Sequence, residues 1–133
     1  GCQPLARRLC REYASWAPTQ ERALFGEEFE RSARGAALLA SASAIVGMHP
    51  DQATHPIVEA AIARAIPFAI VPCCVFPTFF PHKRVGGGGG ARRVRTYEDL
   101  CAHIATCAPG VVEERLDFEG RNRAFFWHPR LVR

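Results

Sequence analysis

The chain has 133 residues and a hydrophobic content of 48%, the size and composition of one globular domain with a core of its own. Its net charge of +4 arises from 17 basic and 13 acidic residues, a surplus that permits an anionic partner but does not require one. No apolar run approaches the roughly 20 residues of a membrane span, and six cysteines are few for a secreted disulfide scaffold. We therefore exclude a membrane-spanning protein and expect an intracellular, cytoplasmic one.

The N-terminal segment, 1–41, is expected to be helical. It begins with Gly1 rather than Met, so we expect a fragment or a processed product, and the lack of a visible signal peptide does not exclude an organelle. Apolar residues recur on one face over 3–16. Thr19 is the expected N-cap of a second helix that continues to about residue 39. The inner stripe of this second helix is expected to be Phe25, Phe29, Ser32 and Ala36.

Two strands separated by a helix follow. The nearly continuous apolar run over 42–48 predicts a strand that is buried on both faces, as in parallel sheets. A polar loop over 49–52 ends it, and Thr54 is expected to cap the next helix. A second buried strand is expected over 68–71, followed by a loop that is rich in proline and phenylalanine.

A third helix is expected to begin after Thr96, with Asp99 at the acidic position of its first turn. Five consecutive glycines precede it at 86–90. They follow no expected strand and lead directly into no helix, which indicates a flexible low-complexity insertion. The apolar face of the third helix is expected to be Tyr97, Leu100, Cys101, Ile104 and Ala108.

The C-terminal part is expected to be an antiparallel hairpin, with strands over 111–118 and 123–128 joined by the turn 119–122. Strands that alternate with helices imply parallel pairing with right-handed crossovers. We therefore predict an α/β domain over 42–133: a partial Rossmann-like sheet of parallel strands with a terminal antiparallel hairpin, preceded by two helices.

Two short motifs follow the two expected parallel strands: Gly47-Met48-His49-Pro50-Asp51 and Pro72-Cys73-Cys74. Their order and spacing resemble the S-adenosylmethionine-dependent methyltransferase-like superfamily, where some families carry a Gly-Leu-His-x-Cys-Gly type motif after strand four and Cys-Cys after strand five. That group includes RNA methyltransferases and the methyltransferase-like domain of glutathione-S-transferase C-terminal-domain-containing proteins. The resemblance covers about 42–128, with Asp51-Gln52 in place of Cys-Gly. It implies strands four to seven of that fold, so that the last strand should run antiparallel between two neighbours.

The resemblance implies S-adenosylmethionine as cofactor. It does not identify the methyl acceptor, for which RNA or another anionic substrate is a candidate. The cofactor-binding half of the fold has no counterpart in the sequence, because no expected strand leads into a G-x-G-x-G turn and no acidic residue ends a following strand. The glycines at 86–90 would stand after strand five. The cofactor-binding residues therefore stay unknown, and we expect the chain alone to be inactive, with an exposed sheet edge that is open to association.

Ligands of open α/β sheets bind at the carboxyl ends of the strands, so we expect the site there. His49 is a candidate proton acceptor, and Asp51 is a candidate hydrogen-bond acceptor toward cofactor or substrate. We expect His49, Cys73 and Gly120 to follow parallel strands along one edge of the sheet. The candidates for substrate binding are Cys73, Phe76 and Arg121.

Each of these candidates also has a purely structural interpretation. The residues after the first strand can cap their own loop, and adjacent cysteines can pack as small apolar residues. Gly120 or Asn122 can serve the turn with a positive φ. No C-x-x-C pair exists, and the Cys and His residues of the third helix do not supply four ligands, so we expect no metal site.

The glycines are flanked by basic residues at 81–84 and 92–95, and phenylalanines precede them. Arginines with aromatic side chains suit single-stranded nucleic acid, while the plainer interpretation is a solubilising charged loop. Three hypotheses follow: part of a methyltransferase, a non-catalytic methyltransferase-like binding module with an Arg-rich loop, and a gene-model fragment without independent function.

Overall fold

The computed structural model describes residues 18, 20–86 and 90–130. The helix expected over 3–16 and the expected N-cap Thr19 lie outside these residues. The helices are α2 (Glu27–Arg31), α3 (Ala33–Ser41), η2 (Asp51–Ala53), α4 (Thr54–Ala63) and α5 (Tyr97–Thr106). The strands are β1 (Ile45–Met48), β2 (Phe68–Val71), β3 (Arg84–Val85), β4 (Arg92–Arg93), β5 (Val112–Arg115) and β6 (Arg123–Trp127).

Four strands form one mixed sheet in the order β1-β2-β6-β5. β1 and β2 pair in parallel, with Val46 opposite Ala69. β6 is antiparallel to both of its neighbours, with Phe125 opposite Ile70 of β2 and Glu113 of β5. The expectation that the last strand runs antiparallel between two neighbours is therefore confirmed, and the protein is mixed α/β.

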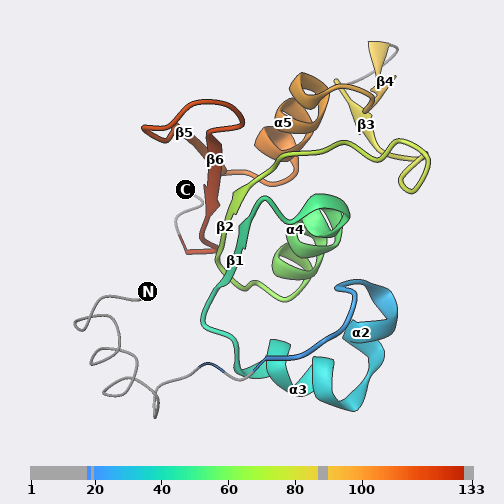
Figure 1. Cartoon of the computed structure of the whole chain (residues 1–133), viewed down its shortest axis with the longest axis vertical. Helices are drawn as coiled ribbons and strands as arrows, with labels where there is room; N and C mark the ends of the chain where they lie inside the picture. Colours follow the sequence, from blue (N-terminus) through green and yellow to red (C-terminus); the bar gives the residue numbers. More distant parts are fainter. Residues whose placement is uncertain (1–17, 19, 87–89, 131–133) are drawn as a thin grey trace, which may run out of the picture.

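Helices α4 and α5 lie on the same face of this sheet (Figure 1). Their apolar side chains join those of the sheet in one cluster, which has the fully buried Phe125 at its centre. The opposite face, which we call the open face, carries Val46 and Met48 at 75% and 62% exposure. Phe126 of β6 and Val112 of β5 are also exposed there, because they occupy the same cross-strand row as Val46 and Ala69.

The expectation that the first strand is buried on both faces is wrong. Its burial alternates, with Gly47 buried between the exposed Val46 and Met48. A run of apolar residues does not report which faces are covered, since that depends on how many helices pack on the sheet. β1 is an edge strand with helix α4 on one side only among the described residues.

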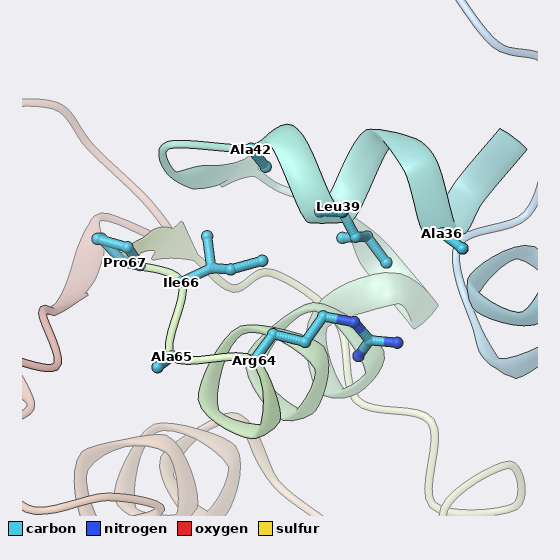
Figure 2. A pocket seen from close by; sticks show the side chains of 8 residues that line it. Ala36, Leu39, Ala42, Arg64, Ala65, Ile66 and Pro67 are labelled. Carbon is cyan, nitrogen blue, oxygen red and sulfur yellow. The ribbon is translucent and has the colours of Figure 1, made fainter.

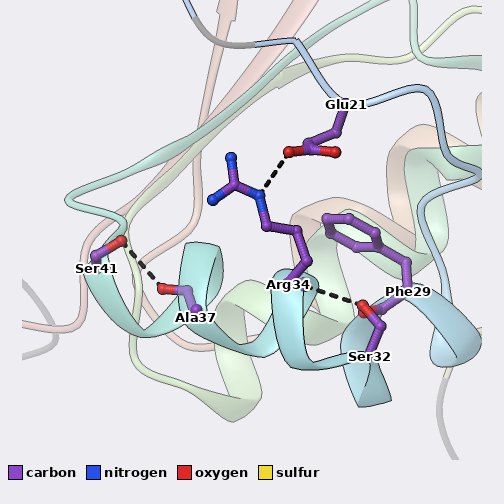
Figure 3. A network of polar contacts seen from close by, with 7 residues as sticks. Glu21, Phe29, Ser32, Arg34, Ala37 and Ser41 are labelled. Carbon is purple, nitrogen blue, oxygen red and sulfur yellow. Dashed lines mark hydrogen bonds and ion pairs between the residues drawn. The ribbon is translucent and has the colours of Figure 1, made fainter.

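The single helix expected from Thr19 to about residue 39 is two short helices. Ser32 has an extended ψ of 148° and caps α3 by accepting a hydrogen bond from the Gly35 amide at 2.9 Å. Figure 3 shows Ser32 at the start of this helix. Its hydroxyl also donates to the Phe29 carbonyl at 2.7 Å. Serine competes with helical backbone bonds in this way, so an N-cap stands where the periodicity predicted an inner-stripe residue.

The start of α4 also differs from expectation. Thr54 lies within the helix, and its hydroxyl donates to the Asp51 carbonyl at 2.8 Å rather than capping the helix. The preceding turn is the 3-10 helix η2. At α5 the expectation is confirmed: Thr96 accepts from the Asp99 amide, and Asp99 accepts from the Thr96 amide, both at 3.1 Å.

The residues around the glycine run form a second, two-stranded sheet of β3 and β4. Gly86 follows β3 directly, so the expectation that the glycines follow no strand is wrong. Val85 and Val94 are buried in the core, and Lys83 is buried in an ion pair with Glu59. Strands of two residues are too short to show an alternation of apolar and polar side chains in the sequence. Tertiary packing therefore decides the conformation of β3 and β4.

Removing the central aromatic side chain should destabilise the fold strongly. We expect Phe125→Ala to lower the free energy of unfolding by about 3–5 kcal/mol, since it leaves a cavity in a fully buried cluster. The matched control is its neighbour Phe126→Ala on the open face, where 39% exposure limits the loss to roughly 1 kcal/mol. Urea unfolding measures both, and equal losses would contradict the one-sided core.

His55 of α4 should make stability depend on pH. Burial, together with the charges of His103, Lys83 and His82, lowers its pKa to about 3. Because the unfolded chain protonates this histidine near pH 6.5 and the folded chain only near pH 3, stability is lost as pH falls through that window.

The loss attributable to His55 should reach about 1 kcal/mol per pH unit. His55→Phe, which keeps an aromatic ring against Phe80, should show a shallower decline between pH 6 and 4. The difference in slope should vanish at pH 7–8, where the histidine is neutral in both states. Parallel urea-unfolding curves for the two proteins at every pH would refute this role.

Candidate functional site

Three loops meet at the carboxyl edge of the sheet: those after β1 and β2 and the turn from β5 to β6. The His49 Nε2 atom lies 2.9 Å from the Arg121 carbonyl oxygen, and the Cys73 thiol donates to Asp51 Oδ1 at 3.1 Å. The His49 amide donates to the Val71 carbonyl at 2.9 Å. The expectation that these loops share one edge is therefore confirmed, and four of the five candidate residues are brought together.

The backbone of the β1 loop is held in a costly conformation. His49 and Asp51 have φ values of 48° and 49°, in the left-handed region that costs non-glycine residues on the order of 1–3 kcal/mol. Gly47 precedes them, and a side chain there would meet Pro50, Ile57 and Ile70 at 3.1–3.3 Å. The chain thus passes close to Ile57 of α4 and then turns sharply. This turn places His49 and Asp51 at the carboxyl edge of the sheet.

The tautomer of His49 follows from its partner. A carbonyl oxygen only accepts hydrogen bonds, so in the neutral ring Nε2 carries the proton and Nδ1 keeps the lone pair. The Phe118 ring lies edge-on with its centroid 6.2 Å from that of the His49 ring. The imidazole is thereby fixed by two contacts from the β5–β6 turn, and its Nδ1 atom is a base of fixed position.

The β5–β6 turn is organised by its own polar groups. Gly120 has a φ of 95°, as the turn interpretation predicted. The Asn122 side-chain Nδ2 donates to the carbonyls of Leu116 and Phe118 at 3.1 and 2.8 Å. The Arg121 guanidinium lies over the Tyr97 ring, 4.0 Å from its centroid. This cation–π contact directs Arg121 over α5, so its carbonyl and not its charge contacts His49.

Tyr97 was not a candidate from sequence, where its spacing indicated core. It is buried, and its hydroxyl has no hydrogen-bond partner among the described residues. Burial raises the pKa of Tyr97 to about 12, so the phenol is neutral at pH 7. Helical periodicity identifies the buried face correctly but cannot show that a polar atom on it lacks a partner.

Phe76 is the candidate that the structure does not join to the others. Its ring stacks on Phe79 with centroids 5.8 Å apart, and its carbonyl accepts bonds from the Phe79 and Phe80 amides. These contacts form a compact turn after β2. The turn leads the chain away from the carboxyl edge.

Cys74 joins the site, although adjacent residues of a strand would point to opposite faces of the sheet. The thiols of Cys73 and Cys74 and a carboxylate oxygen of Asp51 all lie within 4.8 Å of one another. Opposite orientation applies to residues within a strand, but β2 ends at Val71, so both cysteines belong to the loop. Burial, followed by the hydrogen bond to Asp51, raises the pKa of Cys73 to about 11.

A hollow near the opposite edge of the sheet lies between α3 and the loop from α4 to β2 (Figure 2). It measures about 410 Å³ and is lined mainly by alanines and by Leu39, Ile66 and Pro67. Its one charged lining residue, Arg64, forms an ion pair with Glu30 at 2.8 Å. This composition offers apolar contact and no acid–base chemistry.

A charged hollow of about 320 Å³ lies beside the start of α5. Arg92, Arg93, Arg95, Thr96 and Asp99 line it. Arg92 forms an ion pair with Asp99, and Arg93 donates to the Pro81 carbonyl at 3.0 Å. Two of the three arginines are thus engaged within the protein, and parts of the two basic segments pair as β3 and β4.

Comparisons of the chain with protein-family models, with curated proteins and with solved structures returned no significant match. Among the described residues, no helix is long and apolar enough to cross a membrane. The residues and their geometry therefore carry the functional argument.

The Cys73 thiol should react slowly with iodoacetamide at neutral pH, because only the thiolate is nucleophilic and the pKa of Cys73 is about 11. Asp51→Asn removes the negative charge that accepts the thiol proton, so Cys73 should alkylate faster. Asparagine also tolerates the left-handed backbone. Peptide-resolved mass spectrometry measures the rate, with the exposed Asp117→Asn as control. Equal Cys73 rates in the two variants would contradict the contact.

Proposed function

We propose that the chain is the acceptor-binding half of an S-adenosylmethionine-dependent methyltransferase domain. The observation that carries this proposal is the strand order β1-β2-β6-β5, with β6 antiparallel between β2 and β5. The resemblance of the motifs at 47–51 and 72–74 implied this order for strands four, five, seven and six. Fold alone does not define activity, so the proposal rests equally on the polar groups at the carboxyl edge.

The open face of the sheet and its β1 edge support the proposal that a second, cofactor-binding half of the domain exists. β1 ends the sheet, and Val46 and Met48 project from it into solvent. An exposed apolar face next to an unpaired parallel strand is typical of a surface that other structure covers. We propose that a cofactor-binding half on another segment or chain continues the sheet from β1, and that this edge is where association occurs.

The described residues do not provide a fitting cofactor site. The glycine run lies in the β3–β4 connection, and β4 rather than a helix follows it, whereas pyrophosphate- and nucleotide-binding turns need a strand before and a helix after. The cofactor would supply an electrophilic methyl group from the other half. The residues of this chain would then bind and orient the acceptor, which is a large part of catalysis in displacement reactions.

His49 is the best-placed base for the acceptor. Its Nε2–H is directed to the Arg121 carbonyl, which leaves Nδ1 to accept the proton that an acceptor O–H or N–H loses. Asp51 would accept a hydrogen bond from the acceptor, with the Cys73 thiol beside Asp51 and the Arg121 backbone beside His49. RNA is one class of acceptor consistent with the proposal.

The runner-up is a non-catalytic binding module that holds an anionic partner such as RNA. The specific observation in its favour is the hollow lined by Arg92, Arg93 and Arg95. Guanidinium groups bind phosphates with paired hydrogen bonds. Binding of single-stranded RNA that weakens steeply with salt and is lost in Arg95→Ala, with no methyl transfer by the longest native form, would favour this function.

The proposed function predicts that residues 1–133 alone show no measurable S-adenosylmethionine binding by titration calorimetry. Losing several cofactor hydrogen bonds, each worth roughly 0.5–1.5 kcal/mol, weakens binding by orders of magnitude. A protein that also carries the cofactor-binding half should bind it. Tight binding by residues 1–133 would show that the site is misplaced, and no binding by the longer protein would favour the runner-up.

In the active longer protein, His49→Ala should lower kcat with little change in cofactor affinity. General-base catalysis contributes typically about 100- to 10,000-fold, which sets the expected loss. The matched control is His128→Ala. The His128 ring accepts a hydrogen bond from the Arg130 amide and lies away from the carboxyl edge. A kcat that is equal in both variants would remove His49 from the mechanism.

A further inference from the structure

We propose that Asp51, Cys73 and Cys74 form a zinc-binding site. Two sulfur atoms and one carboxylate oxygen converge at the carboxyl edge, all within 4.8 Å of one another. Tetrahedral zinc with Zn–S bonds of about 2.3 Å and a Zn–O bond of about 2.0–2.2 Å places its ligand atoms roughly 3.5–3.8 Å apart. The three side chains therefore need only small rotations to enclose one ion.

The elements of the fold hold these ligands in position. Asp51 is anchored through its carbonyl, which accepts the Thr54 hydroxyl at 2.8 Å. The two cysteines follow β2 and the buried Pro72 directly. Because β1 and β2 are parallel neighbours, their carboxyl ends bring the two loops side by side. The convergence thus follows from the sheet and not from one flexible segment.

The donor set selects the class of metal. Thiolates favour Zn²⁺ and other thiophilic ions, while Mg²⁺ and Ca²⁺ require oxygen ligands. Three protein ligands leave a fourth position for water or a substrate atom, as catalytic zinc sites do. Cys74 and Asp51 are exposed and Cys73 is half-buried, so an ion can enter from solvent.

Metal binding would replace the hydrogen bond that now joins the ligands. The Cys73 thiol donates to Asp51 at 3.1 Å, and its proton must leave before sulfur can bind zinc. The ion takes the place of that proton between the two side chains, and the protons of both the Cys73 and the Cys74 thiol are released to solvent. Zinc affinity should accordingly rise with pH.

The experiment titrates the reduced 1–133 chain with Zn²⁺ in competition with a chromophoric chelator, and with Co²⁺ as a spectroscopic probe. We expect one ion per chain and a sulfur-to-cobalt charge-transfer band in the near ultraviolet. Cys73→Ser and Cys74→Ser should each weaken Zn²⁺ binding by about 100-fold or more, beyond the 10- to 100-fold typical of losing an outer-shell partner. Asp51→Asn should weaken it while the band persists.

Matched controls separate this site from the other thiols. Cys107→Ser removes a half-buried cysteine at the C-terminal end of α5. The double variant Cys2→Ser/Cys10→Ser removes the two cysteines nearest the N-terminus. Both variants should keep the full affinity for Zn²⁺. Circular dichroism verifies folding, and if Cys73→Ser unfolds, the exposed Cys74→Ser and Asp51→Asn decide the question.

Three results would overturn the proposal: no Zn²⁺ binding by the intact chain, binding that survives the Cys73→Ser/Cys74→Ser double variant, or binding that is lost only with Cys2 and Cys10. The first would identify the Cys73–Asp51 contact as a brace between loops. No cofactor or acceptor enters this measurement, so its outcome is independent of the proposed methyltransferase function.

Discussion

The insertion of β6 between β2 and β5 is the constraint on which the rest of the structure depends. It buries Phe125 fully and stacks Trp127 on Phe68 with ring centroids 5.9 Å apart, and the Trp127 indole donates to the Pro109 carbonyl at 3.0 Å. Because β6 runs antiparallel, the turn that precedes it stands at the carboxyl edge of β1 and β2. The contact of Arg121 with His49, 72 positions apart in the chain, is a direct consequence.

Polar groups gather at the carboxyl edge because backbone groups and side chains at the ends of the strands are not covered by a helix. The left-handed φ values of His49 and Asp51 are maintained by bonds on both sides: the ladder bond to Val71, the imidazole bond to Arg121 and the hydroxyl bond from Thr54. Strain of this kind persists only where the surroundings overdetermine it, and it clusters at functional sites. The proposed base and the proposed metal site are therefore two uses of one strained loop.

The sheet is covered on one face only among the described residues, and this asymmetry connects stability to function. The cluster of α4, α5, Phe68 and Phe125 provides a continuous core, whereas Val46 and Met48 lie in solvent. A single-sided sheet can fold, but its bare apolar face favours association. This face adjoins the β1 edge, from which the proposed cofactor half would continue the sheet.

The sequence by itself determined the elements that local chemistry specifies. Spacing and turn chemistry predict the capping box of Thr96 and Asp99, the positive φ of Gly120, the alternation of strands and helices, and the antiparallel last strand. They also predict that His49, Asp51 and Cys73 meet, because parallel strands share a carboxyl edge. Only the tertiary structure decided which faces are covered, that Ser32 divides one helix into two, that Val85 and Lys83 are buried, and that Cys74 turns toward Asp51. Each of these four features depends on residues distant in the chain, whose packing overrides local propensity. A sequence pattern within a few residues therefore cannot predict them.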